Sequence, residues 1–181
     1  MMNWLRHNFV ASIILTVIRV YLGYEWMMDG INKLTMKGGF SAQGMIMGAI
    51  KQPVVGPHGQ PYPLFTWFLK TFTDGGKHAE VFSFLVSWGE FLVGLGMIVG
   101  LLTLPAVFFA LVMNFSYMFA GVISVNPWYI LLEFFLMAGG FNSAKIGLDR
   151  WATPWFRKVL PFLRKHGETE VRIEKALTVY E

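Results

Sequence analysis

Four long apolar stretches constrain this chain more than any other feature. They cover about residues 9–31, 81–102, 104–123 and 127–146. A helix needs ~20 apolar residues to cross the ~30 Å hydrocarbon core of a bilayer, and each stretch reaches or approaches that length. The chain is 55% hydrophobic and only 14% charged, which is too apolar for a soluble domain of 181 residues. We therefore expect an all-α, integral membrane four-helix bundle formed by residues 1–150.

The connections between these stretches differ in length. Little more than "TLP" separates the second stretch from the third, and "GVISVNP" separates the third from the fourth, so these helices should pack as antiparallel neighbours. The first connection, residues 32–80, is much longer. Its segments "AQGMIMGAIK" and "LFTWFLKTF" are too short to span a bilayer, and a stretch with four prolines separates them. We expect two short interfacial helices here, which lie on the membrane surface or cover the bundle mouth as a lid.

Lysines and arginines set the expected orientation, because cytoplasmic loops of membrane proteins are enriched in them. The side of the chain with both termini holds Arg6, Lys145, Arg150, Arg157, Lys158, Arg164, Lys165, Arg172 and Lys175. The long loop on the other side holds Lys33, Lys37, Lys51, Lys70 and Lys77. We predict a multi-pass protein of the cell membrane with both termini in the cytoplasm. Residues 151–181 then form a cytoplasmic amphipathic tail with basic residues and tryptophans at the lipid headgroups.

Charged and amide side chains interrupt the apolar stretches at similar heights. Counting ~1.5 Å per residue from the outer end of each helix places the group roughly 9 to 18 Å deep. Its members are Arg19, Glu25, Glu90, Asn114 and Glu133. A charge that faces lipid at such depth costs ~3 kcal/mol or more, so these side chains should turn inward and pair with one another. We predict one polar pocket in the outer half of the bundle.

The charges of this predicted pocket suggest proton chemistry. The single guanidinium of Arg19 cannot neutralise the carboxylates of Glu25, Glu90 and Glu133, so at least one of them should stay protonated and exchange protons. We take these three as candidate catalytic residues. The candidate substrate-binding residues are Arg19, Trp26, Lys33, Trp88, Asn114 and Tyr117. The alternative is a static hydrogen-bonded knot that holds the helices together.

Several kinds of chemistry are not expected. The chain has no cysteine, which removes thiolate metal sites and dithiol relays, so redox chemistry would need a bound cofactor. All four histidines lie outside the apolar stretches, so we expect no metal and no haem. No nucleotide-binding motif lies in a suitable context, and the basic residues form no helix face suited to nucleic acid. An electron donor would therefore have to come from another protein.

Several motifs together resemble a known family. They are "RVYLGYEWMMDGINKL", "GGFSAQG", "WGEFLVGLGMIVGLLT", "MNFSYMFAG", "NPW" and "FNSAKIGLDRW". Over residues from about 12 to 151 the chain resembles the DoxX/DoxD family of small four-helix membrane proteins. The resemblance is to the branch described as the membrane subunit of a thiosulfate:quinone oxidoreductase or as a membrane oxidoreductase. It implies electron delivery to membrane quinone with a partner subunit. The family's recurring positions correspond to Arg19, Gly23, Trp26, Lys33, Glu90 and Asp149.

Two functions remain open at this stage. In the first, the pocket binds a quinone or a small anionic substrate, and a second oxidoreductase subunit or electron donor supplies electrons for the quinone pool. In the second, the chain is a non-enzymatic membrane subunit or a proton-linked small-solute carrier. Membrane lipid surrounds the protein in both, and both are compatible with an oligomer.

Overall fold

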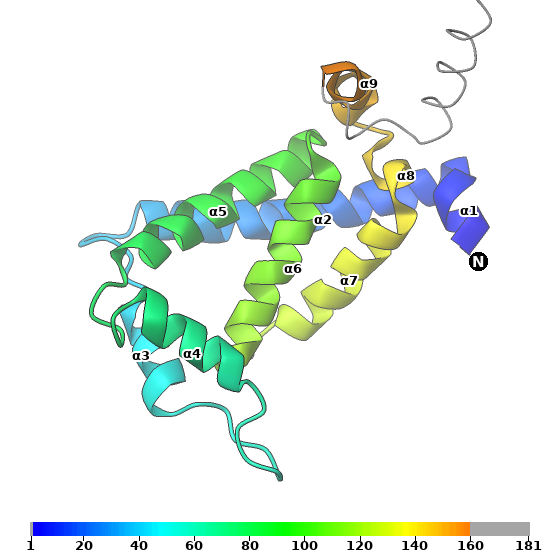
Figure 1. Cartoon of the computed structure of the whole chain (residues 1–181). Helices are drawn as coiled ribbons and strands as arrows, with labels where there is room; N and C mark the ends of the chain where they lie inside the picture. The colour runs from blue at the N-terminus through cyan, green and yellow to red at the C-terminus, as the bar shows by residue number, and fades with distance from the viewer. Residues whose placement is uncertain (1, 160–181) are drawn as a thin grey trace, which may run out of the picture.

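The computed structural model describes residues 2–159 (Figure 1). Within that range the chain forms nine helices and no β-strand, which confirms the all-α prediction. The helices are α1 (Met2–His7), α2 (Phe9–Leu34), α3 (Gln43–Lys51), α4 (Pro63–Phe72), α5 (Glu80–Val99), α6 (Thr103–Phe119), α7 (Asn126–Gly139), α8 (Phe141–Ala144) and α9 (Asp149–Val159). In this described part, α2 and α5 are long and apolar enough to cross a bilayer, and α6 is a shorter apolar helix.

Helices α2 and α5 form the first pair and run antiparallel along much of their length (Figure 1). Glycines allow their backbones to approach closely. A methyl group added at Gly94 would lie 2.3 Å from the backbone nitrogen of Met27, and one at Gly30 would lie 2.4 Å from that of Phe91. Because no side chain fits at either point, the glycines fix how α2 and α5 cross.

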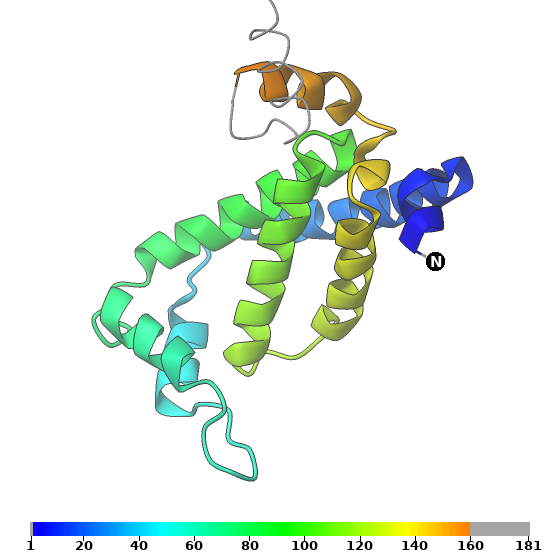
Figure 2. The ribbon, with the colours of Figure 1, turned by 45° about the vertical axis from the view of Figure 1, so that its right-hand side comes forward.

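Helices α6 and α7 form the second antiparallel pair, which diverges from the first (Figure 2). The tight turn between α5 and α6 uses left-handed backbone at Gly100 (φ 67°) and Leu102 (φ 53°). The fourth predicted stretch, residues 127–146, is not one helix. Gly140 (φ 57°, ψ −133°) ends α7 in a conformation that suits glycine, and the short α8 follows.

Helices α3 and α4 lie where the sequence places two short helices in the long loop. They sit at the end of the molecule opposite α9, beside the ends of α5 and α6 (Figure 2). Their buried side chains form a small core that includes Ile46 and Leu69, and Tyr62 packs on Phe119 with ring centroids 4.4 Å apart. The loop is therefore a packed element. Of the predicted tail, the structure describes residues 151–159 as part of α9, and the remainder lies outside the described residues.

The outer faces of the long helices carry large exposed apolar side chains. Val17 on α2 is 65% exposed, Phe84 on α5 is 62% exposed and Phe109 on α6 is 56% exposed. The main core lies between the helix pairs and includes Leu22 and Met97. The molecule thus has an apolar interior and an apolar outer surface, and its buried polar side chains lie where the helices meet.

Candidate functional site

A cavity of about 310 Å³ lies where the two helix pairs diverge. Helices α2, α5, α6 and α7 all contribute to its wall, and the segments before α3 and α7 complete it. Its lining residues are Trp26, Asp29, Lys33, Phe40, Ser41, Ala42, Met45, Glu90, Asn114, Tyr117, Val122, Ser124, Val125, Asn126 and Tyr129. Eight of these fifteen residues are apolar or aromatic and seven are polar or charged, a combination found in small-molecule sites.

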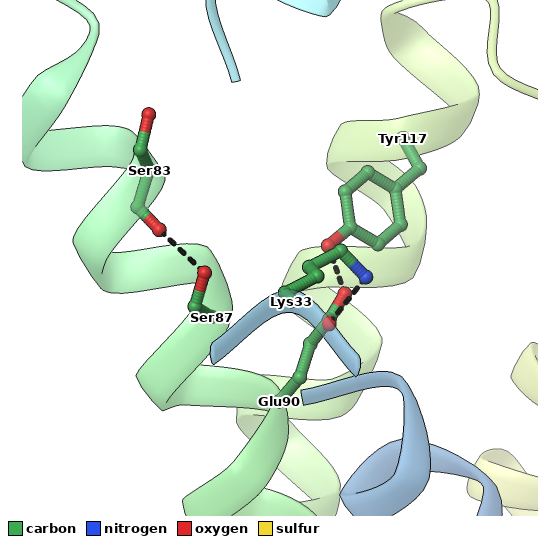
Figure 3. A network of polar contacts seen from close by, with 5 residues as sticks. All are labelled: Lys33, Ser83, Ser87, Glu90 and Tyr117. Carbon is green, nitrogen blue, oxygen red and sulfur yellow. Dashed lines mark hydrogen bonds and ion pairs between the residues drawn. The ribbon is translucent and has the colours of Figure 1, made fainter. Parts of the chain in front are cut away.

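Glu90 is the centre of the charged group in the cavity wall (Figure 3). Its Oε2 accepts a hydrogen bond from the Lys33 ammonium and its Oε1 accepts one from the Tyr117 hydroxyl, both at 2.5 Å. The Glu90 side chain is 2% exposed, whereas that of Lys33 is 22% exposed. The ammonium of Lys33 also lies 5.5 Å from the ring centre of Phe40. Three helices thus bring the carboxyl group of Glu90, the ammonium of Lys33 and the phenol of Tyr117 together at one edge of the cavity.

A second buried carboxylate, that of Glu133, lies behind the cavity wall. It accepts hydrogen bonds from the Trp26 indole at 3.0 Å and from the Asn114 amide at 2.9 and 3.0 Å. The amide of Asn126 donates to Asn114 Oδ1 at 3.0 Å. Trp26, Asn114 and Asn126 line the cavity themselves, so this network holds the cavity wall and connects Glu133 to it.

Arg19 is not part of this site, and the prediction that it pairs with the buried carboxylates is wrong. It is 2% exposed and lies near the α5–α6 turn, where it donates to the backbone carbonyls of Ser143 at 3.0 Å and Ile146 at 2.6 Å. Two glycines create its slot: a methyl group at Gly100 would lie 2.7 Å from Nη1. Because α7 ends at Gly139, backbone carbonyls after it are available to bond the Arg19 guanidinium. The cation that pairs with Glu90 is Lys33 instead.

Asp149 belongs to the same structural region as Arg19. Its carboxylate accepts from the backbone N–H groups of Leu102 at 2.8 Å and Thr103 at 2.7 Å, at the start of α6. This is the usual role of an acidic side chain at a helix N-terminus. Arg19 and Asp149, which the family resemblance singled out, therefore tie the α5–α6 turn to the segment after α8.

The structure also places Glu25 and Trp88 outside the cavity, against the prediction that both belong to one pocket. Glu25 is half-buried near Tyr129 and is not among the described residues that line the cavity. Trp88 is 41% exposed and packs edge-on against Phe91 on the outside of α5. Successive helical residues are turned by about 100°, so Trp88 and Glu90, two positions apart, face nearly opposite directions.

Sequence reasoning missed part of the site. Asp29 lies one turn before Lys33 on α2, but the Lys33 ammonium reaches Glu90, and Asp29 lines the cavity without having been a candidate. Asn126, in the turn before Pro127, was not a candidate either, although its side chain is buried and bonded to Asn114. Its position one residue before a helix-opening proline was the available signal.

Comparisons with protein-family models, curated proteins and solved structures gave no match to this chain. Among residues 2–159, no group of three or more acidic or histidine side chains is arranged to hold a metal ion. The chemistry of the site must therefore be argued from its own geometry.

Proposed function

We propose that this chain is a DoxX-like integral membrane oxidoreductase component whose cavity binds the headgroup of a quinone. The observation that carries the proposal is the placement of Lys33, Glu90 and Tyr117 at one edge of an otherwise largely apolar, aromatic cavity. A quinone ring needs flat apolar walls, hydrogen-bond donors for its carbonyl oxygens and groups that exchange protons. This cavity offers all three.

A membrane location is the first part of the proposal. The length and composition of α2 and α5 support it, as do the exposed apolar side chains on α5 and α6. We propose that α2, α5, α6 and the α7–α8 unit cross the bilayer, with α3 and α4 at the outer face. Exposed Trp151 and Trp155 on α9 suit the headgroup region at the cytoplasmic side.

A neutral ligand fits the charges of the cavity better than a small anion does. The anion hypothesis depended on Arg19, which lies elsewhere. In the cavity wall, Lys33 is paired with Glu90, and Asp29 adds a further acidic side chain. Because two acidic side chains face one ammonium in this wall, the cavity would repel the negative charge of an anionic ligand.

The proposed chemistry balances as the reduction of a quinone to a quinol, which takes up two electrons and two protons. Lys33 and Tyr117 already direct N–H and O–H groups at the edge of the cavity, and Glu90 connects them. We propose that a further N–H of the Lys33 ammonium, which has three donors, hydrogen-bonds a quinone carbonyl, and that Tyr117 and Glu90 pass protons to it as electrons arrive. Electrons come from a partner oxidoreductase subunit, and the family resemblance suggests thiosulfate as their source.

One observation favours the non-enzymatic alternative. The carboxylates of Glu90 and Glu133 have hydrogen-bond partners within the protein, as expected if they only fasten the helices together. A proton-linked carrier is less well supported, because Arg19 and the close backbones of Gly100 and Gly147 fill the opposite end of the bundle.

Quinone content of the purified protein tests the proposal. The protein is purified from native membranes in mild detergent, and quinone is extracted and quantified per mole of protein. We expect about one quinone per chain, lost in Glu90→Gln. The matched control is Glu25→Gln, an acid on a neighbouring helix that does not line the cavity, and it should retain quinone.

Two results would contradict the proposed function. One is a purified protein that holds no quinone and binds none added back. The other is an equal loss of quinone in Glu25→Gln and Glu90→Gln, which would place binding elsewhere. Proton flux into liposomes without any quinone would support a carrier instead.

A further inference from the structure

A second, smaller cavity adjoins the first. Its volume is about 160 Å³, and it lies among α3, α4, α5 and α6. Its lining residues are Met45, Ile46, Phe65, Phe68, Leu69, Phe82, Leu85, Val86, Met113, Ser116 and Tyr117. Met45 and Tyr117 line both cavities. The two spaces are therefore neighbours with a shared wall.

The chemistry of the second cavity differs sharply from that of the first. Its lining includes no charged residue among those described, and aliphatic, aromatic and methionine side chains dominate it. The hydroxyl of Ser116 donates to the backbone carbonyl of Val112 at 2.7 Å, and the hydroxyl of Tyr117 donates to Glu90 in the first cavity. Neither hydroxyl is left to bind a polar ligand, so the second cavity suits hydrocarbon.

The second cavity reaches the apolar outside of the helices. Leu85 and Phe68 line it and are nevertheless 56% and 38% exposed. Next to Leu85 on α5, Phe84 is 62% exposed. An apolar chain that leaves the cavity between these side chains would meet the surface that the proposed function places in lipid.

The shared wall can let a chain through. Met45 is unbranched, with rotatable bonds along its whole side chain, so it can change rotamer at little cost. Tyr117 donates its hydroxyl to Glu90 and is also a lining residue of the second cavity. A ligand whose polar ring contacts Tyr117 in the first cavity would thus have its tail directed past Met45 into the second.

From this juxtaposition we infer that the ligand is a membrane-dissolved quinone with an isoprenoid or alkyl tail, and that the second cavity is the passage for the tail. This inference rests on the proposed function and adds to it the place of the quinone tail.

A cavity-filling substitution tests the passage. Val86→Phe places a ring in the second cavity, whereas Val112→Phe adds the same ring at a 44% exposed site on α6 that lines neither cavity. Binding of a tailless dimethoxy-methyl-benzoquinone and of its decyl derivative is measured for the full-length protein in lipid nanodiscs. We expect Val86→Phe to weaken binding of the decyl derivative at least about tenfold and that of the tailless ring less than about twofold. Val112→Phe should change neither.

A measurement on the unsubstituted protein guards against misfolding of the variant. The protein is incubated with a decyl quinone that carries a diazirine at the end of its tail, and the complex is irradiated. Mass spectrometry then maps the residues to which the tail has become attached. We expect label in residues 82–86, 113–117 or 65–69. Label confined to α7 or α9, or equal weakening of both quinones by Val86→Phe, would overturn the tail passage but leave quinone binding intact. Failure of either quinone to bind the unsubstituted protein would overturn the proposed function as well.

Discussion

Removal of the Lys33 ammonium should destabilise this protein more than removal of the whole Lys33–Glu90 pair. In Lys33→Met, the Glu90 side chain, 2% exposed, loses the ammonium that pairs with it, and the Tyr117 hydroxyl remains as its donor. Breaking a buried pair by deleting one partner costs about 3–5 kcal/mol. Because Lys33 itself is 22% exposed, water screens part of the interaction, so we expect a loss somewhat below that range, about 2–3 kcal/mol.

The double variant Lys33→Met/Glu90→Gln should recover most of that loss. It leaves no unpaired charge, and glutamine still accepts a hydrogen bond from Tyr117. We expect it to lie within about 1 kcal/mol of the unsubstituted protein, so that Glu90→Gln offsets most of the cost of Lys33→Met in a double-mutant cycle. Replacement of Lys37, an exposed lysine just after α2, by Met is the matched control and should cost less than about 0.5 kcal/mol.

The free energy of unfolding can be measured by titrating the protein in mixed micelles with sodium dodecyl sulfate and following helicity by circular dichroism. The reasoning is refuted if Lys33→Met unfolds at the same detergent fraction as the unsubstituted protein. It is also refuted if the double variant is as unstable as Lys33→Met, because the cost would then not come from an unpaired carboxylate.

Two further predictions concern the packing that positions the cavity. Gly94→Ala should lower the unfolding free energy by about 2 kcal/mol or more, because its methyl group would lie 2.3 Å from the Met27 nitrogen. Gly89→Ala is the control: its methyl group would meet only the Met113 sulfur, at 3.3 Å, so it should be neutral or slightly stabilising in the same titration. Asp149→Ala should cost about 1–2 kcal/mol by uncapping α6, and Asp149→Asn should cost less; equal effects of the two would argue against a capping role.

The all-helical class and the approximate positions of most helices followed from the sequence because both are local properties, although the break at Gly140 in the fourth stretch did not. Long apolar stretches and the glycine and proline residues between them indicate helices and turns without reference to other parts of the chain. The two short helices of the long loop could be placed for the same reason. Burial of Arg19, Glu90 and Glu133 was also predictable, since none of these side chains tolerates an apolar exterior.

The partners of those buried groups were decided by tertiary structure. Periodicity gives each residue a face and a height on its own helix, but it does not say which neighbour meets that face. Gly30 brings the backbone of α2 against Phe91, and Lys33, one turn further along, therefore reaches Glu90 instead of its local neighbour Asp29. Counting along the helices gave Arg19 a height similar to that of the acids, but in the structure it lies near Gly100, where the break after α7 leaves backbone carbonyls for it to bond. Helix crossing angles and chain breaks thus determine which residues line the cavity. Both depend on contacts between residues far apart in the sequence.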